Sequence, residues 1–154
     1  MELIFTPQIR LVITVVLAML LGGIIGVDRE FSGRPAGLRT HVLVGGAAAL
    51  IVALGDTLVK RLGLGSELMR ADPLRVIEAV ITGVSFLGAG TIFRRSDSDH
   101  VEGLTTAASL LFVAVVGVCT AVGQIGTAVV MTVFALVGLP SGVWLEGFFQ
   151  KPRQ

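Results

Sequence analysis

The sequence has few charged residues, almost no net charge and a single cysteine. Only 15% of its 154 residues are charged, whereas 53% are hydrophobic and the mean hydropathy is +0.88; a soluble domain has about a quarter charged residues. The net charge of +1 argues against nucleic-acid binding, which needs a clustered excess of Lys and Arg. Cys119 alone cannot build a disulfide framework or a thiolate metal site. The composition therefore predicts a surface that mostly faces lipid.

The sequence also lacks the usual catalytic motifs. No serine or threonine has an evident His/Asp partner in the sequence, and no Gly-rich loop with lysine is present to hold phosphates. We therefore expect neither enzyme activity nor a cofactor.

Long apolar runs between short polar stretches predict an all-α polytopic membrane protein. A span needs about 20 mostly apolar residues, and because hydrocarbon offers no hydrogen bonds, each run should form a helix. Five runs qualify within one transmembrane domain at residues 1–149, which a short tail at 150–154 follows. The expected spans are residues 9–27, 39–59, 74–93, 104–122 and 125–144. Thr6 and Asp72, each followed by proline, are expected to cap the first and third helices.

An internal repeat relates the two halves of the chain. At a constant offset of 66 residues, Gly22 matches Gly88 and Arg29 matches Arg95. A helical hairpin that occurs twice returns the chain to its starting side, so both copies should have the same orientation, with a fifth helix added. Seven Lys and Arg residues then lie on the side of the bends and the C-terminus, against five on the other side. This difference favours the bends and the C-terminus in the cytoplasm.

Small residues recur every four positions on two of the expected helices. They are Ala18, Gly22 and Gly26 on the first and Gly45, Ala49 and Ala53 on the second. Such faces let helix backbones approach closely in lipid. We expect packing between these helices and, for the same reason, a homo-oligomer.

The first bend, residues 28–41, contains five formal charges and a histidine. The sequences Gly-Leu-Arg-Thr at 37–40 and Gly-Leu-Thr-Thr at 103–106 each open a helix, where the free N–H groups and the helix dipole favour an anion. Arg34 and Arg39 would strengthen such a site. An alternative is that Thr40 and Thr105 only cap their helices while the arginines meet lipid phosphates.

The remaining titratable groups leave further alternatives open. The charges at 28–30 either serve a ligand or pair with arginines at 34, 39, 94 and 95 and so hold the two bends together. Asp56 and Glu78 lie near span ends, where they are either ion-linked acids, such as ligands of a hydrated magnesium ion, or groups that reach the interface. His41 and His100 flank the bends and are expected to be solvated.

Three separated motifs resemble the MgtC/SapB family of bacterial inner-membrane proteins. They are Gly-Val-Asp-Arg-Glu-Phe…Arg-Pro-Ala-Gly-Leu-Arg-Thr-His (26–41), Phe-Leu-Gly-Ala-Gly (86–90) and Gly-Leu-Thr-Thr-Ala-Ala-Ser (103–109). The resemblance is to a short form without the C-terminal soluble domain of longer members. The motif residues carried over are Asp28, Arg29, Glu30, Arg34, Pro35, Gly37, Leu38, Arg39, Thr40, His41, Gly88, Gly90, Gly103, Thr105 and Thr106.

The resemblance implies a multi-pass protein of the inner membrane with a periplasmic N-terminus. It also implies links to magnesium limitation and, in pathogens, to survival inside macrophages, and it offers the proton-driven ATP synthase as a membrane partner. Ser85, Ala79 and Glu102 depart from the family's common residues.

Three functional hypotheses follow. The first is a non-enzymatic membrane protein that acts by helix contacts on a partner complex or on ion homeostasis. The second is a transporter of magnesium, another cation or a small solute, with its site between the repeats near Gly88 and Gly90. The third and weakest is a membrane enzyme that acts on a lipid headgroup through Asp28, Glu30 and His41.

Overall fold

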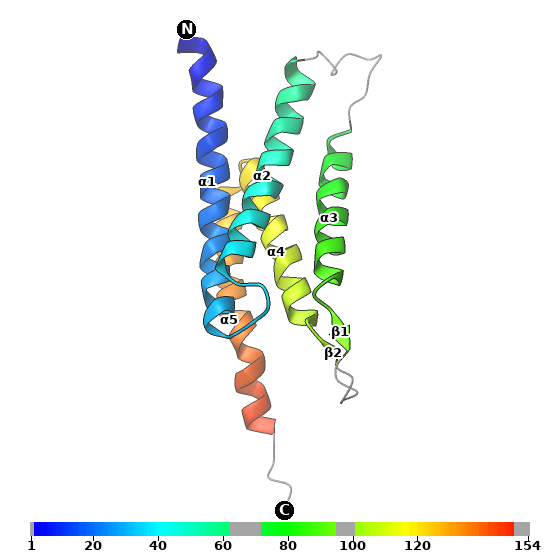
Figure 1. Cartoon of the computed structure of the whole chain (residues 1–154). Coiled ribbons are helices and arrows are strands. Elements are labelled where there is room, and N and C mark those ends of the chain that lie inside the picture. The colour runs from blue at the N-terminus through cyan, green and yellow to red at the C-terminus, as the bar shows by residue number, and fades with distance from the viewer. Residues whose placement is uncertain (1, 62–71, 95–100, 150–154) are drawn as a thin grey trace, which may run out of the picture.

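Five helices and one pair of very short strands make up the described part of the chain. The computed structural model describes residues 2–61, 72–94 and 101–149. The helices are α1 (Glu2–Phe31), α2 (Leu38–Arg61), α3 (Pro73–Ala89), α4 (Leu104–Ala121) and α5 (Ile125–Phe149). The strands β1 (Phe93–Arg94) and β2 (Val101–Glu102) pair antiparallel (Figure 1).

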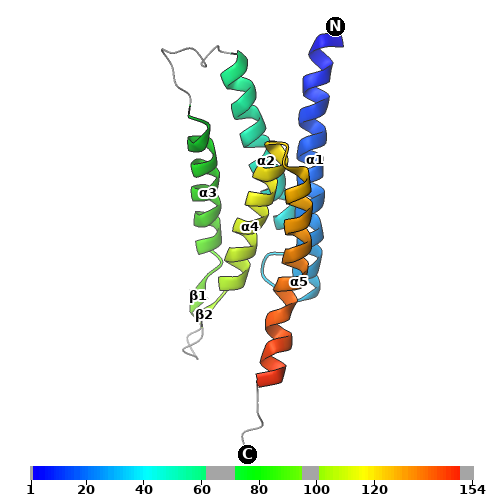
Figure 2. The same ribbon diagram turned by 180° about the vertical axis from the view of Figure 1, so that it is seen from behind.

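Successive helices run in opposite directions, as the repeat predicts. The bend between α1 and α2 and the β1–β2 pair between α3 and α4 lie at the same end of the bundle (Figure 1). Seen from behind, α5 lies beside α1 and α4, and the described chain finishes at that same end (Figure 2). The predicted architecture of two equally oriented hairpins and a fifth helix is therefore confirmed.

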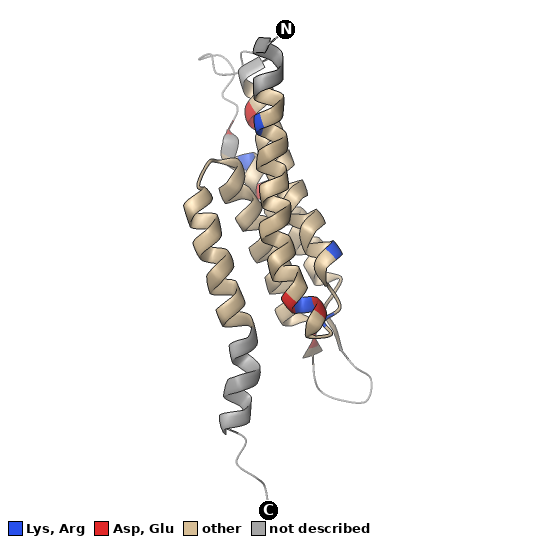
Figure 3. Ribbon diagram, turned by 90° about the vertical axis from the view of Figure 1, so that its left-hand side faces the viewer, with Lys and Arg blue, Asp and Glu red and all other residues tan. Residues whose placement is uncertain are grey.

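Three of the described helices are long and apolar enough to cross a membrane. They are the segments Pro7–Phe31, Leu38–Val59 and Leu104–Ala121. Helix α3, with 17 residues, is slightly shorter and ends at Ala89 rather than at residue 93, because the chain turns at Gly90 into β1. In α1, no charged residue lies between Arg10 and Asp28, so the charges stand near the two ends of the helix (Figure 3). The middle of the helix therefore suits hydrocarbon.

The core lies where α1, α2 and α4 meet. Its largest buried side chains include Ile25, Leu110 and Val113, none of which has exposed area. Helix α3 packs at one edge of this trio against α4 and α2, and α5 packs at another edge against α1 and α4 (Figures 1 and 2). The two hairpins thus share one apolar interface.

Glycine allows the backbones of α1 and α2 to touch. A Cβ atom added at Gly22 would lie 2.6 Å from the His41 carbonyl oxygen, and one at Gly45 would lie 2.9 Å from the Ala18 carbonyl oxygen. Both distances are too short for a side chain, so these positions require glycine. The sequence prediction that the small-residue faces serve packing holds for this pair of helices.

The two proline-linked cap predictions have different outcomes. Asp72 caps α3 as expected: its Oδ1 accepts the Leu74 N–H at 2.9 Å, and Pro73 occupies the first helical position. The expectation for Thr6 is wrong, because α1 begins at Glu2 and Pro7 lies inside the helix. Proline is tolerated there because the lost hydrogen bond falls in the first turns.

Hydroxyl groups inside the apolar helices bond within their own helix. Thr14, Thr57, Thr120 and Thr132 each donate to the carbonyl oxygen four residues earlier, at 2.8–2.9 Å. Because each donor is satisfied locally, these polar residues are compatible with a membrane interior.

Candidate functional site

The end of α1 is closed by a compact backbone turn. The amides of Ser32, Gly33 and Arg34 donate to the carbonyl oxygens of residues 28, 30 and 29, each at 3.0 Å. Gly33 has φ +63°, a left-handed conformation that ends helices and favours glycine. The following residues, Pro35 and Ala36, lead into α2, and Ala36 is buried against the bundle.

Glu30 caps the neighbouring helix rather than pairing with an arginine. Its Oε2 accepts the Leu38 N–H at 2.8 Å, which places a carboxylate at the N-terminus of α2. A Cβ atom at Gly37 would lie 2.8 Å from the same oxygen, so glycine makes room for this contact. The anion expected at the start of α2 is therefore supplied by the chain itself.

His41 connects the two hairpins inside the core. Its ring has no exposed area; Nδ1 lies 2.9 Å from the Gly37 carbonyl oxygen and Nε2 lies 3.1 Å from Ser109 Oγ on α4. A carbonyl oxygen only accepts, so Nδ1 donates to Gly37. Ser109 Oγ lies 2.8 Å from the Thr106 carbonyl oxygen as well, so its single proton is shared between that oxygen and the His41 ring. The expectation of a solvated His41 is wrong, because the packing of α2 on α4 encloses it.

Arg29 is also enclosed, but without a matching partner. Only 2% of its surface is exposed, and its Nε, which is buried, has no hydrogen-bond partner among the described residues. Within that same set, no ion pair joins the charges at 28–30 to Arg34 or Arg39. The expected pairings with residues 94 and 95 involve side chains outside those described. A buried N–H without an acceptor is costly, which makes Arg29 unusual among the described residues.

The second bend is built differently. Gly103, with φ +90°, sits at the start of α4 against the Thr91 carbonyl group, and no side chain caps this helix. Thr105 is exposed, whereas Thr106 is buried. Within the described part of the chain, neither Thr105 nor Thr40 forms a capping hydrogen bond. At the end of α3, Gly88 packs against Ala107, and its carbonyl oxygen accepts the Thr91 hydroxyl at 2.7 Å. Gly90 is the C-cap of α3.

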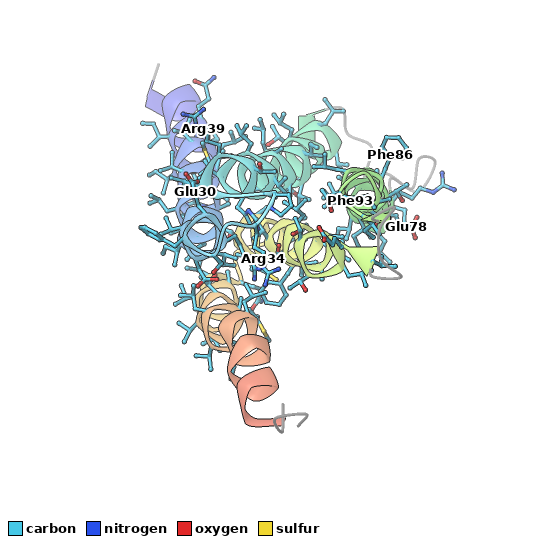
Figure 4. The ribbon with its side chains drawn as sticks, turned by 60° about the horizontal axis from the view of Figure 1, so that its bottom comes forward. Glu30, Arg34, Arg39, Glu78, Phe86 and Phe93 are labelled. Carbon is cyan, nitrogen blue, oxygen red and sulfur yellow. The ribbon has the colours of Figure 1, made fainter. Side chains whose placement is uncertain are left out.

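The two acids singled out as ion-linked candidates are not brought together. Asp56 lines a cleft of about 1030 Å³ between α1, α2 and the α4–α5 turn, at the end of the bundle opposite the bends. Glu78 projects from the outer side of α3, away from the other helices (Figure 4). No group of three His, Cys, Asp or Glu side chains suited to a metal occurs among the residues described. His100 lies outside that set.

The partner of His41, Ser109, could not be identified from the sequence. Ser109 belongs to the third motif, but it was not among the candidate site residues. A signal existed, since Ser109 follows Thr106 by three residues and so lies on the same buried face of α4. The pairing itself spans 68 residues, which no local pattern reveals.

Comparison with known proteins agrees with this architecture. The model of the MgtC family matches residues 15–148, so the chain is a membrane protein that belongs to the MgtC family. It is 43% identical over 121 residues to Protein MgtC of Brucella abortus, covering 77% of the chain and 45% of that protein. It is 37% identical over 153 residues to Protein SrpB of Synechococcus elongatus, covering 90% and 80%.

A further relative is the protein of Escherichia coli K12 named "Putative magnesium transporter YhiD". The identity is 36% over 132 residues, covering 83% of the chain and 58% of YhiD. The chain therefore spans less than two thirds of the length of MgtC and of YhiD. No solved structure matches.

Proposed function

We propose that this chain is a non-enzymatic membrane protein that supports magnesium homeostasis through contacts within the membrane with a partner protein. Membership of the MgtC family and the name given to YhiD support the link to magnesium. The proton-driven ATP synthase is the partner that the family resemblance suggests. A homo-oligomer would use the same kind of contact.

The observation that carries this proposal is an unused small-residue face on α3. A Cβ atom at Gly83 would meet nothing within 4 Å, in contrast to the glycines of α1 and α2. Ala79, one turn earlier, is also exposed, and Phe86 beside this face is 84% exposed. Small residues on a lipid-facing helix favour close approach of another helix. We therefore assign α3 as the contact helix.

Co-purification after crosslinking in membranes tests the assignment. Gly83→Leu should abolish recovery of the partner, because leucine blocks close helix approach. Thr82→Leu is the matched control: it adds a similar volume to an exposed neighbouring position about 100° around the helix. Equal recovery from both variants, or no membrane complex with the wild type, would rule out α3 as the contact helix.

The proposed placement is the bacterial inner membrane, with the N-terminus in the periplasm and both bends in the cytoplasm. The charge count of the sequence supports this orientation. Single cysteines at positions 32 and 98, introduced into Cys119→Ala, should react with a membrane-impermeant maleimide only after the cytoplasmic side is opened. Labelling of both positions from the periplasm would reverse the proposed orientation. Labelling of only one of them from the periplasm would contradict the placement of both bends on one side of the membrane.

Transport is a second candidate, and the large cleft opposite the bends favours it. Arg10, Thr14 and Thr57 line this cleft with Asp56, which gives it the polar groups that an ion or small solute requires. The cleft lies away from Gly88 and Gly90, where the sequence had suggested a site. Reconstituted protein should then show Mg²⁺ flux that Asp56→Asn abolishes and Glu78→Gln, on the far side of α3, leaves unchanged. Absence of flux in the wild type would eliminate this candidate.

A further inference from the structure

We propose that Arg29 and Arg34 form a binding site for a phosphate group at the bend end of the bundle, and that a membrane phospholipid supplies it. This site is separate from the contact face on α3 and does not depend on the proposed function.

The first observation is the unmet hydrogen-bonding capacity of Arg29. A guanidinium carries five N–H donors and no acceptor, and it stays charged. Arg29 is 98% enclosed by the protein, yet its Nε has no hydrogen-bond partner among the described residues. A buried donor on a cation is costly without an acceptor, and an acceptor with negative charge stabilises it most. A phosphate fits, because its oxygens match the planar fork of the guanidinium.

The second observation is the arrangement of charges around Arg29. The guanidinium of Arg34 and the carboxylate of Asp28 are the charges near Arg29, and they act on it with opposite signs. Glu30, the other nearby acid, is bonded to the Leu38 N–H. Figure 4 shows Glu30 and Arg39 on one side of the α1–α2 hairpin, whereas Arg34 extends on the other side, toward α4 and α5. Two cations with one counterion, Asp28, leave net positive charge at the site.

The third observation identifies the source of the phosphate. A cavity of about 260 Å³ lies between α1, α4 and α5, and Ile25, one helical turn before Arg29, lines it. Its other lining side chains include Phe112, Met131 and Phe134, and only Ser109 is polar. An acyl chain suits such a cavity and inorganic phosphate does not. A lipid would place its headgroup phosphate at Arg29 and Arg34 and one acyl chain in the apolar cavity between α4 and α5.

Lipid titration of the full chain tests the proposal. Protein in phosphatidylcholine nanodiscs is titrated with phosphatidic acid and, separately, with inorganic phosphate, and bound lipid or the shift in melting temperature gives the apparent Kd. Phosphatidic acid should bind to the wild type saturably. Arg34→Gln, at an exposed position, should weaken binding at least about tenfold, and Arg29→Lys should weaken it similarly because lysine lacks the fork. Arg39→Gln, of equal charge change, should bind as the wild type does.

A cavity variant separates the two sources of phosphate. Ala135→Phe, which fills the cavity from α5, should weaken phosphatidic acid binding. If this variant binds lipid normally and inorganic phosphate binds the wild type with the same dependence on Arg29 and Arg34, the phosphate site stands but its lipid source is overturned. If Arg29→Lys and Arg34→Gln bind as tightly as the wild type, or the wild type binds neither probe, the site itself is overturned.

Discussion

The two hairpins of this protein share an orientation but not a way of packing. Gly22 of α1 contacts His41 of α2, and 66 residues later Gly88 of α3 contacts Ala107 of α4. In the first hairpin, the added Cβ would meet a backbone oxygen at 2.6 Å; in the second, its nearest neighbour would be the Ala107 methyl group at 3.3 Å, with backbone atoms of Ala107 at ordinary contact distances of 3.4 and 3.5 Å. Equivalent positions thus build a tight hairpin and a looser one.

The difference arises from the residues that follow. Gly45 and Gly46 of α2 have Leu111 and Phe112 as their counterparts in α4, so the second hairpin is bulkier where the first is smallest. Bulky side chains keep helix axes apart, whereas glycines let backbones touch. Helix α4 instead uses its apolar face against both helices of the first hairpin. The first hairpin and α4 therefore form the core, and α3 remains as a looser outer helix.

The largest effect should distinguish the equivalent glycines. Gly22→Ala should lower the free energy of unfolding by about 1–3 kcal/mol, because the new methyl group overlaps a backbone atom that cannot move aside. Gly88→Ala should cost less than about 1 kcal/mol, since only the Ala107 methyl group must shift slightly. SDS titration in mixed micelles, with helical circular dichroism as the signal, measures both. Equal losses would mean that the hairpins pack alike.

Removing the hydrogen bond between the hairpins should have the next largest effect. Ser109→Ala leaves Nε2 of the buried His41 without a partner and should cost about 1–3 kcal/mol. Thr132→Ala is the control, because that hydroxyl, also buried, bonds only within its own helix and should cost less than about 1 kcal/mol. The same titration compares them, and a loss no greater than the control would show that the His41–Ser109 bond does not stabilise the fold.

A smaller effect concerns the side-chain cap at the bend of the first hairpin, which the bend of the second hairpin lacks. Glu30→Gln keeps an oxygen for the Leu38 N–H but removes the charge, so it should cost about 0.3–1 kcal/mol, and less at high salt. Glu30→Ala removes both and should cost about 1 kcal/mol. Unfolding titrations at two salt concentrations separate the contribution of the hydrogen bond from that of the charge. A loss of stability in Glu30→Gln that does not depend on salt would contradict the charge contribution.

The smallest change should have the opposite sign. Gly83→Ala on α3 adds a methyl group where nothing lies within 4 Å, and it removes glycine's backbone freedom. A gain of about 0.5 kcal/mol in helix stability is expected. The measurement is again SDS titration, with Gly22→Ala as the contrasting helix glycine. A clear loss would show that α3 packs against more of the chain than the described contacts include.

Much of the fold follows from local sequence. Hydropathy located all five helices, since a segment's affinity for hydrocarbon depends on its own residues. The two-fold repeat set the relative direction of the hairpins, because an even number of crossings returns the chain to its starting side. Asp72 and Pro73 fixed the start of α3, because an N-cap acid followed by proline favours a helix start at that point of the sequence. The family motifs located the polar bends within a few residues.

The candidate site could be predicted only in part, because partners there depend on which helix packs against which. Glu30 had several arginines within reach in the sequence, and the turn at Gly33 directs it to the Leu38 N–H instead. Burial of Arg29 follows from its position at the end of α1, on the side that packs into the bundle. None of these outcomes is visible in the order of residues alone.

By itself, then, the sequence determined a family, a set of membrane helices and their directions, all of which depend on composition over a few turns. The tertiary structure alone decided that His41 is enclosed and bonded to Ser109, and that Arg29 is buried with an Nε that has no hydrogen-bond partner among the described residues. The physical reason is that burial and hydrogen bonding are properties of two surfaces in contact, and the contacts between α1, α2 and α4 join residues far apart in the chain.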